Sequence, residues 1–215
     1  LEALKGKQTD EEKRAAIDQC LRETLAEAVA GVEYTAIIRG ITCGDVLRVG
    51  CSQTLLPSEG KQIIAPLKEL FKEEVRYVGE KLGMPPEITA AQPFPGTGLA
   101  MRIMGEATKD KLDTLRCADA LFCDMMVEAG LHKRLWKYYA MLHPSNKAEG
   151  SAVISLRAIS RVDMQSGEVA AVPARLPYDL LERYVQSVRE GCPGIAKVVY
   201  DVTPGTVSQS VPWHD

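Results

Sequence analysis

Residues 92–106 read QPFPGTGLAMRIMGE, and this stretch separates two parts of the sequence that differ in character. Prolines and glycines crowd residues 93–98, which excludes both a helix and a regularly hydrogen-bonded strand there. Proline fixes its own φ and lacks a donor, whereas glycine admits positive φ and lets another group approach the main chain. The stretch therefore predicts either a rigid backbone wall for a flat ligand or a plain turn between two domains.

Composition limits the classes of function. The chain has 215 residues and a net charge of −3, so no general surface for nucleic acid is expected. No apolar run approaches the ~20 residues of a membrane span, and no signal-peptide pattern is present. We therefore expect a cytoplasmic protein without membrane or nucleic-acid partners. The first residue is Leu1 rather than methionine, which leaves open that the sequence is a fragment.

The cysteines give no sign of a metal site. Six are present, none in a Cys-x-x-Cys pair and none clustered in sequence with histidine. In a chain without a secretory signal, such scattered thiols are typical of free and mostly buried cysteines in a reducing compartment. We expect all six to be free: Cys20, Cys43, Cys51, Cys117, Cys123 and Cys192.

The first part of the chain predicts an α/β arrangement. A helix is expected over 9–30, where Thr9 and Glu12 have the spacing of a capping box. The β-branched run 32–38 is typical of a strand buried in a parallel sheet, and the apolar stripe of 63–82 predicts one long helix. Helix followed by buried strand is half of an α/β unit.

Ligands of open parallel sheets bind beyond the carboxyl ends of the strands. The residues that follow the strand at 32–38 include Gly40, Thr42 and Asp45, which are thus placed for nucleotide binding. An equally open interpretation is that Asp45 only caps the following turn.

The second part of the chain has α+β character. The elements expected there are helices over 108–129 and 177–190, a shorter helix that holds Leu135, Trp136 and Tyr139, strands over 152–159 and 195–202, and an edge strand over 207–213. The boundary falls in the proline-containing run 84–92. We therefore expect two domains, residues 1–90 and 91–215.

Four groups of segments resemble the GMP synthetase family and keep its order along nearly the whole chain. They are LKGKQTDEEKR at 4–14, APLKELFKEEVR at 65–76, the PFPGTGLAMRIMGE run at 93–106, and the set SLRA at 155–158, ARLPY at 174–178 and VVYDV at 198–202. The resemblance implies that residues 1–90 form the C-terminal part of a PP-loop (adenine nucleotide alpha hydrolase-like) parallel-sheet domain. It implies that residues 91–215 form the dimerisation domain.

The resemblance also implies a chemistry. The family uses ATP and Mg²⁺ to adenylate the C2 oxygen of xanthosine monophosphate, and ammonia then displaces AMP to give GMP. Basic side chains and magnesium should surround the departing pyrophosphate. Lys72, Glu73, Glu74 and Arg76 match the family's K-D-E-V-R run, which implies catalytic roles, with Glu73 as metal ligand in place of a shorter aspartate. Without the resemblance, these residues would be interpreted as a solvated helix face.

The resemblance further implies a nucleotide pocket and binding partners. Pro95, Gly96 and Gly98 would shape the wall of the nucleotide pocket. The partners implied are a nucleotide substrate, a second copy of the chain in a homodimer, and a glutamine amidotransferase subunit or domain that supplies ammonia.

The sequence departs from the family where the substrate is held. The phosphate-binding S-G-G-V-D-S loop is absent, the histidines of the family's lid are missing from 47–54, and its R-H pair is replaced at 91–92. A G-D-x-R turn is lost at 146–150, and only Trp213 remains of a terminal K-P-P-x-T-x-E-W-E. Three interpretations stay open: a GMP synthetase-like ligase, a diverged paralogue that adenylates another substrate, or a non-catalytic dimerisation module.

Overall fold

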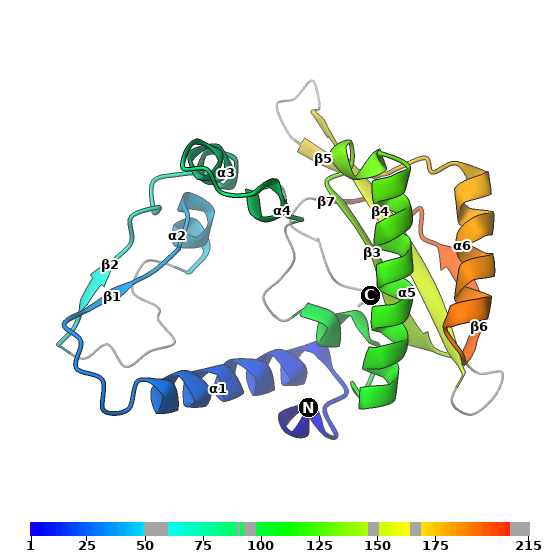
Figure 1. The fold of residues 1–215 in the computed structure, drawn as a ribbon. Helices are drawn as coiled ribbons and strands as arrows, with labels where there is room; N and C mark the ends of the chain where they lie inside the picture. The colour runs from blue at the N-terminus through cyan, green and yellow to red at the C-terminus, as the bar shows by residue number, and fades with distance from the viewer. Residues whose placement is uncertain (50–59, 90, 93–97, 146–150, 164–168, 207–215) are drawn as a thin grey trace. The chain divides into compact units, whose positions relative to one another are not determined.

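The computed structural model describes most of the chain as a mixture of helices and sheets (Figure 1). The described residues are 1–49, 60–89, 91–92, 98–145, 151–163 and 169–206. The chain forms two compact units, called here unit 1 (residues 1–14 and 93–215) and unit 2 (residues 15–92). The first 14 residues thus pack with the C-terminal part of the chain, whereas the assignment of residues 1–90 and 91–215 to two named domains stays a prediction.

Helix α1 (Asp10–Ala28) begins at the predicted capping box. The Thr9 N–H donates to Glu12 Oε2 at 3.0 Å, and the Glu12 N–H donates to Thr9 Oγ1 at 3.2 Å. These bonds satisfy two of the donors that a helix start leaves open. The backbone N–H of Thr9 in particular lowers the pKa of the Glu12 carboxyl. The predicted helix over 9–30 is confirmed, two residues shorter at its end.

Unit 2 contains a pair of parallel strands. Strand β1 (Ala36–Ile38) pairs with β2 (Gln62–Ile64), with Ile37 opposite Ile63. The predicted parallel strand is confirmed but is shorter than 32–38, and only Ile37 of its three residues is buried. The helices of this unit other than α1 are α2 (Cys43–Val49), α3 (Lys72–Lys81) and α4 (Pro86–Thr89).

The prediction of one helix over 63–82 is wrong in its first half. Residues 62–64 belong to β2, a turn follows, and α3 begins only at Lys72. Pro66 contributes to the difference, because a proline disfavours the helical conformation for the residue before it, here Ala65. A proline at the start of a helix cannot be distinguished in sequence from a proline that follows a strand. Here residues 62–64 form a strand because they pair with β1.

Unit 1 is built on a five-stranded mixed sheet. Its central strand β4 is antiparallel to β3 and β5 and parallel to β6, and β7 is antiparallel to β5. The strands are β3 (Lys137–Pro144), β4 (Ala152–Asp163), β5 (Val169–Pro173), β6 (Ile195–Tyr200) and β7 (Gly205–Thr206). The strands predicted over 152–159 and 195–202 are confirmed with changed ends, and β5 was not predicted. The predicted strand 207–213 lies outside the described residues.

The predicted short helix around Leu135, Trp136 and Tyr139 is wrong. A 3-10 turn at Leu131–Lys133 leads instead into β3, which pairs with β4 along its whole length. Aromatic residues have a high strand propensity, and pairing with β4 satisfies the backbone groups of β3 that point toward that neighbour.

Helices α5 (Lys109–Glu128) and α6 (Tyr178–Gly191) lie side by side against the sheet (Figure 1). Both were predicted, and both are confirmed. Phe122 of α5 is fully buried and meets two rings edge-on, Tyr138 of β3 at 6.4 Å and Tyr184 of α6 at 5.5 Å between centroids. This aromatic contact joins α5, α6 and the sheet into one core.

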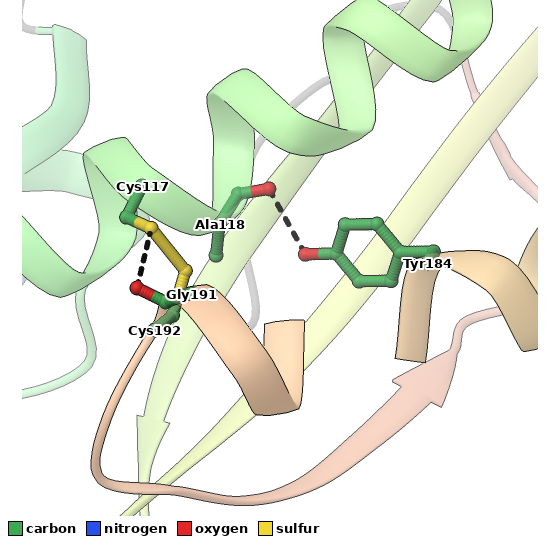
Figure 2. The surroundings of a disulfide bond; sticks show 5 residues. All are labelled: Cys117, Ala118, Tyr184, Gly191 and Cys192. Atoms are coloured by element: carbon green, nitrogen blue, oxygen red, sulfur yellow. Dashed lines mark hydrogen bonds between the residues drawn. A yellow bond between two sulfur atoms is a disulfide. The ribbon is translucent and has the colours of Figure 1, made fainter. Parts of the chain in front are cut away.

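A disulfide joins Cys117 of α5 to Cys192, the residue that caps the end of α6 (Figure 2). The expectation that all six cysteines are free is therefore wrong for these two. Next to the disulfide, the Tyr184 hydroxyl donates to the Ala118 carbonyl at 3.0 Å, so α5 and α6 are linked twice (Figure 2). Cys20, Cys43 and Cys123 are free, as expected, and Cys51 lies outside the described residues.

Removal of this disulfide should lower stability. The bond closes a separation of 75 residues in the chain. A cross-link of this span restricts the unfolded chain strongly, so the Cys117→Ser, Cys192→Ser double variant should lose about 2–4 kcal/mol in free energy of unfolding. Urea unfolding followed by circular dichroism measures the loss. Cys20→Ser, at an exposed free thiol, is the control, and equal unfolding midpoints for the two variants would contradict the prediction.

Candidate functional site

Most of the predicted site residues lie in unit 2, in the turns and helix starts that follow its two parallel strands. Gly40, Thr42 and Asp45 follow β1, and the residues of α3 follow β2. The Cys43 N–H donates to the Leu70 carbonyl at 2.9 Å. This bond brings the start of α2 and the turn before α3 together, so both groups of predicted residues share one end of the strand pair.

Within the first turn, Thr42 and Asp45 bond to each other. Asp45 Oδ2 accepts the Thr42 N–H at 3.0 Å and the Thr42 hydroxyl at 2.8 Å. The Thr42 carbonyl in turn accepts the Asp45 N–H at 3.0 Å. These contacts are those of a helix cap, which is the second interpretation that the sequence left open. A nucleotide would meet this turn through its backbone and through Gly40, unless the cap opens.

The four predicted site residues of α3 divide into two pairs. Glu74 Oε2 accepts the Phe71 N–H at 2.7 Å and so caps α3, and the Arg76 guanidinium donates to the Ala91 carbonyl at 2.7 Å. Lys72 and Glu73 are exposed in the first turn of the helix. Glu74 and Arg76 therefore hold the local structure, whereas Lys72 and Glu73 present their side chains to solvent at the start of the helix.

The predicted glycine and proline wall falls partly outside the described residues. Pro95 and Gly96 are not among them. Gly98 begins the 3-10 helix Gly98–Arg102 with φ of 59°, in the left-handed region that favours glycine. A Cβ built on Gly98 meets no atom within 4 Å, so backbone conformation rather than close packing explains the glycine.

The described residues do not fit a magnesium ion held by protein ligands alone. No group of three or more histidine, cysteine, aspartate or glutamate side chains that could hold a metal occurs in the described ranges. On this turn Glu74 accepts the Phe71 N–H, and the side chain of Glu73 is exposed. One carboxylate suits only an ion held mainly by nucleotide phosphates and water.

Unit 1 contains a buried polar cluster of Tyr139, Arg157 and Asp201, to which the sequence alone assigned no function. Tyr139 of β3 lies opposite Arg157 of β4, and Arg157 Nε is 3.5 Å from Asp201 Oδ2. The Arg157 guanidinium also donates to the Thr203 carbonyl at 3.2 Å, and Asp201 Oδ1 accepts the Thr203 N–H at 2.8 Å. Strand alternation places Tyr139 and Arg157 on the face opposite to Tyr138, which packs on α5. Burial raises the pKa of the Tyr139 hydroxyl, against the effect of nearby Arg157.

The sequence held a signal for this cluster. Arg157 lies in the mostly apolar segment ISLRAI at 154–159, and Asp201, of opposite charge, directly follows the apolar run VVY at 198–200. Charged residues are rarely buried unless they are paired, so two such strands in one sheet predict an ion pair.

An open hollow lies elsewhere in unit 2, at the amino ends of β1 and β2. It is lined by Val32, Glu33, Tyr34, Thr35, Ala36 and Lys61, and the Lys61 ammonium lies 4.5 Å from the centre of the Tyr34 ring. None of the predicted site residues lines it. Helices that are both long and apolar enough to span a membrane are absent from the described residues.

Comparison with known proteins identifies the family. Residues 124–209 match the family model described as the GMP synthase C terminal domain. The glutamine-hydrolyzing GMP synthases of Alkaliphilus metalliredigens and Clostridium acetobutylicum are 34% and 35% identical, each over 227 residues that cover 95% of this chain and 44% of the relative. The chain thus spans less than half the length of these relatives.

An archaeal relative is matched over much more of its own length. A protein of Methanocaldococcus jannaschii, named as one subunit of a glutamine-hydrolyzing GMP synthase, is 30% identical over 223 residues. These residues cover 96% of this chain and 71% of the archaeal protein. The match runs through both units and extends far beyond residues 124–209. The chain belongs to the GMP synthase family.

Proposed function

We propose that the chain forms part of an ATP-dependent ligase that adenylates xanthosine monophosphate and replaces AMP with ammonia to give GMP. The observation that carries the proposal is the match to the archaeal relative, which spans 71% of that protein and both units of this chain. In this proposal, residues 1–90 belong to a PP-loop domain and residues 91–215 form a dimerisation domain of a cytoplasmic homodimer. The ammonia comes from a glutamine amidotransferase, which can be a separate chain, since the archaeal relative is named as one subunit of its enzyme.

The exposed strand pair supports a larger parallel sheet in the working enzyme. The side chain of Ile38 in β1 is 74% exposed and that of Ile64 in β2 is 38% exposed. Parallel sheets normally carry helices on both faces, so we infer further strands, with the helices that cover them, beside this pair. We ascribe those strands, and an ATP-binding S-G-G-V-D-S loop, to the part of the relatives' length that this chain does not span.

The two turns at the carboxyl ends of β1 and β2 form the proposed nucleotide site. Lys72 and Glu73 stand exposed in the first turn of α3, where backbone N–H groups and the helix dipole favour negative charge. Lys72 would stabilise charge on the departing pyrophosphate, and Glu73 would contact magnesium held by the phosphates. Glu74 and Arg76 keep this turn in place. The nucleotide is contacted by Gly40 and by the backbone of the turn before α2, which the bonds between Thr42 and Asp45 hold. From the family resemblance, Pro95, Gly96 and Gly98 are also assigned nucleotide contacts in this proposal.

A direct assay tests the proposal. The full protein that carries this sequence is incubated with ATP, Mg²⁺, ammonium and xanthosine monophosphate, and GMP and AMP are separated by chromatography. Equal amounts of GMP and AMP are expected. Lys72→Met should lower kcat by roughly tenfold to a hundredfold, because one charge-stabilising group is lost. Lys68→Met, at an exposed lysine four residues earlier, should leave kcat unchanged.

A second candidate function rests on a specific departure. Residues 204–215 lack the K-P-P-x-T-x-E-W-E run of the family, which favours a paralogue that adenylates a different carbonyl oxygen. If no GMP forms in the assay, the proposed function is wrong. Pyrophosphate release with another nucleotide or nucleobase would then favour the paralogue.

A further inference from the structure

Lys13 is a fully buried lysine in the first turn of α1, with 0% of its side chain exposed. Its ammonium donates to the Ile103 carbonyl at 2.6 Å and to the Ala100 carbonyl at 3.3 Å, and it lies 3.7 Å from Asp10 Oδ1. Three partners match the three donors of an ammonium group. Burial lowers the pKa of Lys13, and Asp10 opposes that effect. A buried charge destabilises a protein unless it is paired and hydrogen-bonded. The contacts of the Lys13 ammonium are therefore part of the stable structure of unit 1.

The two carbonyls belong to the end of the 3-10 helix Gly98–Arg102 and the residue after it. The last carbonyls of a helix have no partner inside it, and a cation there is favourable. The N-terminal segment adds two contacts nearby, since Glu106 accepts the Gly6 N–H at 2.7 Å and donates its own N–H to Gln8 Oε1 at 3.1 Å. Residues 6–13 therefore hold residues 100–106 from one side.

Arg102 holds the same segment through a different contact. Its guanidinium is 2.7 Å from Asp119 Oδ1 of α5, and that oxygen also accepts the Ala140 N–H of β3 at 2.8 Å. Arg102 thus fixes the turn to α5 and the sheet, whereas Lys13 fixes it to the N-terminal segment. A short 3-10 helix has few internal hydrogen bonds of its own, so its position depends on such contacts.

We propose that Lys13 is a positioning residue for nucleotide binding, because it holds the turn that begins at Gly98. The inference rests on the proposed function, in which Gly98 contacts the nucleotide. Lys13 bonds to backbone carbonyls of the turn and not to reacting atoms. Its loss should therefore weaken binding of xanthosine monophosphate much more than it slows the chemical step.

The test compares the full wild-type protein with Lys13→Met and Lys5→Met. Methionine keeps most of the apolar stem of lysine and removes the ammonium, and Lys5 is an exposed lysine of the same N-terminal segment. For Lys13→Met, we expect KM for xanthosine monophosphate to rise by roughly tenfold while kcat falls less than about threefold. Hydrogen exchange of the amides of 98–107 should accelerate by about tenfold or more, whereas the amides of α6 should exchange as in the wild type. Lys5→Met should match the wild type in every measurement.

Two hydrogen-exchange results would overturn the inference. One is unchanged exchange over 98–107 in Lys13→Met; the other is equal acceleration over 98–107 and α6, which would indicate a general loss of stability. A fall in kcat with unchanged KM would also contradict it. Hydrogen exchange does not require catalytic turnover, so it reports on the positioning of residues 98–107 even if the protein is inactive. A wild-type protein that makes no GMP, while exchange over 98–107 still depends on Lys13, would overturn the proposed function and support the positioning of the turn.

Discussion

Replacement of Arg157 by methionine should lower the free energy of unfolding by about 3–5 kcal/mol, because it leaves the buried carboxylate of Asp201 without its partner charge. Arg157 and Asp201 are each only 9% exposed. The arginine also bonds to the Thr203 carbonyl at 3.2 Å, and that bond is lost as well. Methionine has a similar length, so the loss should reflect charge and hydrogen bonding more than volume. Urea unfolding followed by circular dichroism measures the change.

An exposed ion pair of the same protein provides the matched control. Arg116 lies 2.7 Å from Asp113, with 56% and 44% of the two side chains exposed. Arg116→Met should cost less than about 1 kcal/mol, because exposed pairs contribute little. Adding Asp201→Asn to Arg157→Met should restore part of the loss, since the unpaired charge is removed. If Arg157→Met costs no more than Arg116→Met, the pair has no special role in stability.

The helices that were predicted correctly are determined by sequence features that lie within the helix itself or next to it. Thr9 and Glu12 form a capping box within four residues, and the Thr108 hydroxyl accepts the Lys111 N–H at 3.4 Å at the start of α5. The helical apolar stripes of α5 and α6 are also visible within a single stretch of sequence. Caps and stripes need no knowledge of distant residues, so the two long helices of unit 1 could be placed from sequence.

The elements that sequence placed wrongly depend on distant partners. Residues 137–144 form β3 with β4 as their partner, and the strand propensity of their aromatic residues does not by itself reveal that partner. Residues 62–64 form β2 because β1 lies beside them, with 23 residues between the two strands. The disulfide between Cys117 and Cys192 likewise joins residues 75 apart. Contacts of this kind cannot be derived from the periodicity of one segment.

The candidate site shows the same division. Sequence placed Thr42 and Asp45 correctly at the end of a parallel strand, but it could not decide between a ligand contact and a cap. The structure shows the cap, through the bonds from the Thr42 N–H and hydroxyl to Asp45. Lys13 stood within a segment that resembles the family, yet its role depends on the carbonyls of Ala100 and Ile103, some 90 residues away.

Phe122→Ala, in the core of unit 1, should lower the free energy of unfolding by about 3–5 kcal/mol. Phe122 is fully buried, and its ring meets Tyr138 of β3 and Tyr184 of α6 edge-on. The loss combines the transfer of a large ring to water, the cavity left behind and two aromatic contacts. Denaturant unfolding measures it, with Val127→Ala on the exposed side of the same helix as the control.

The size of the Phe122 effect depends on how far the site can collapse. Tyr184 is held by its hydroxyl bond to the Ala118 carbonyl, and α5 and α6 are joined by the disulfide, so the walls of the cavity resist movement toward each other. We therefore expect the loss for Phe122→Ala to lie at the upper end of the range, and that for Val127→Ala, at a residue 51% exposed, to stay within about 0.5 kcal/mol. When the disulfide is reduced, the walls can approach more closely, and the additional loss caused by Phe122→Ala should become smaller. An equal loss in the oxidised and reduced proteins would show that the disulfide does not stiffen this core.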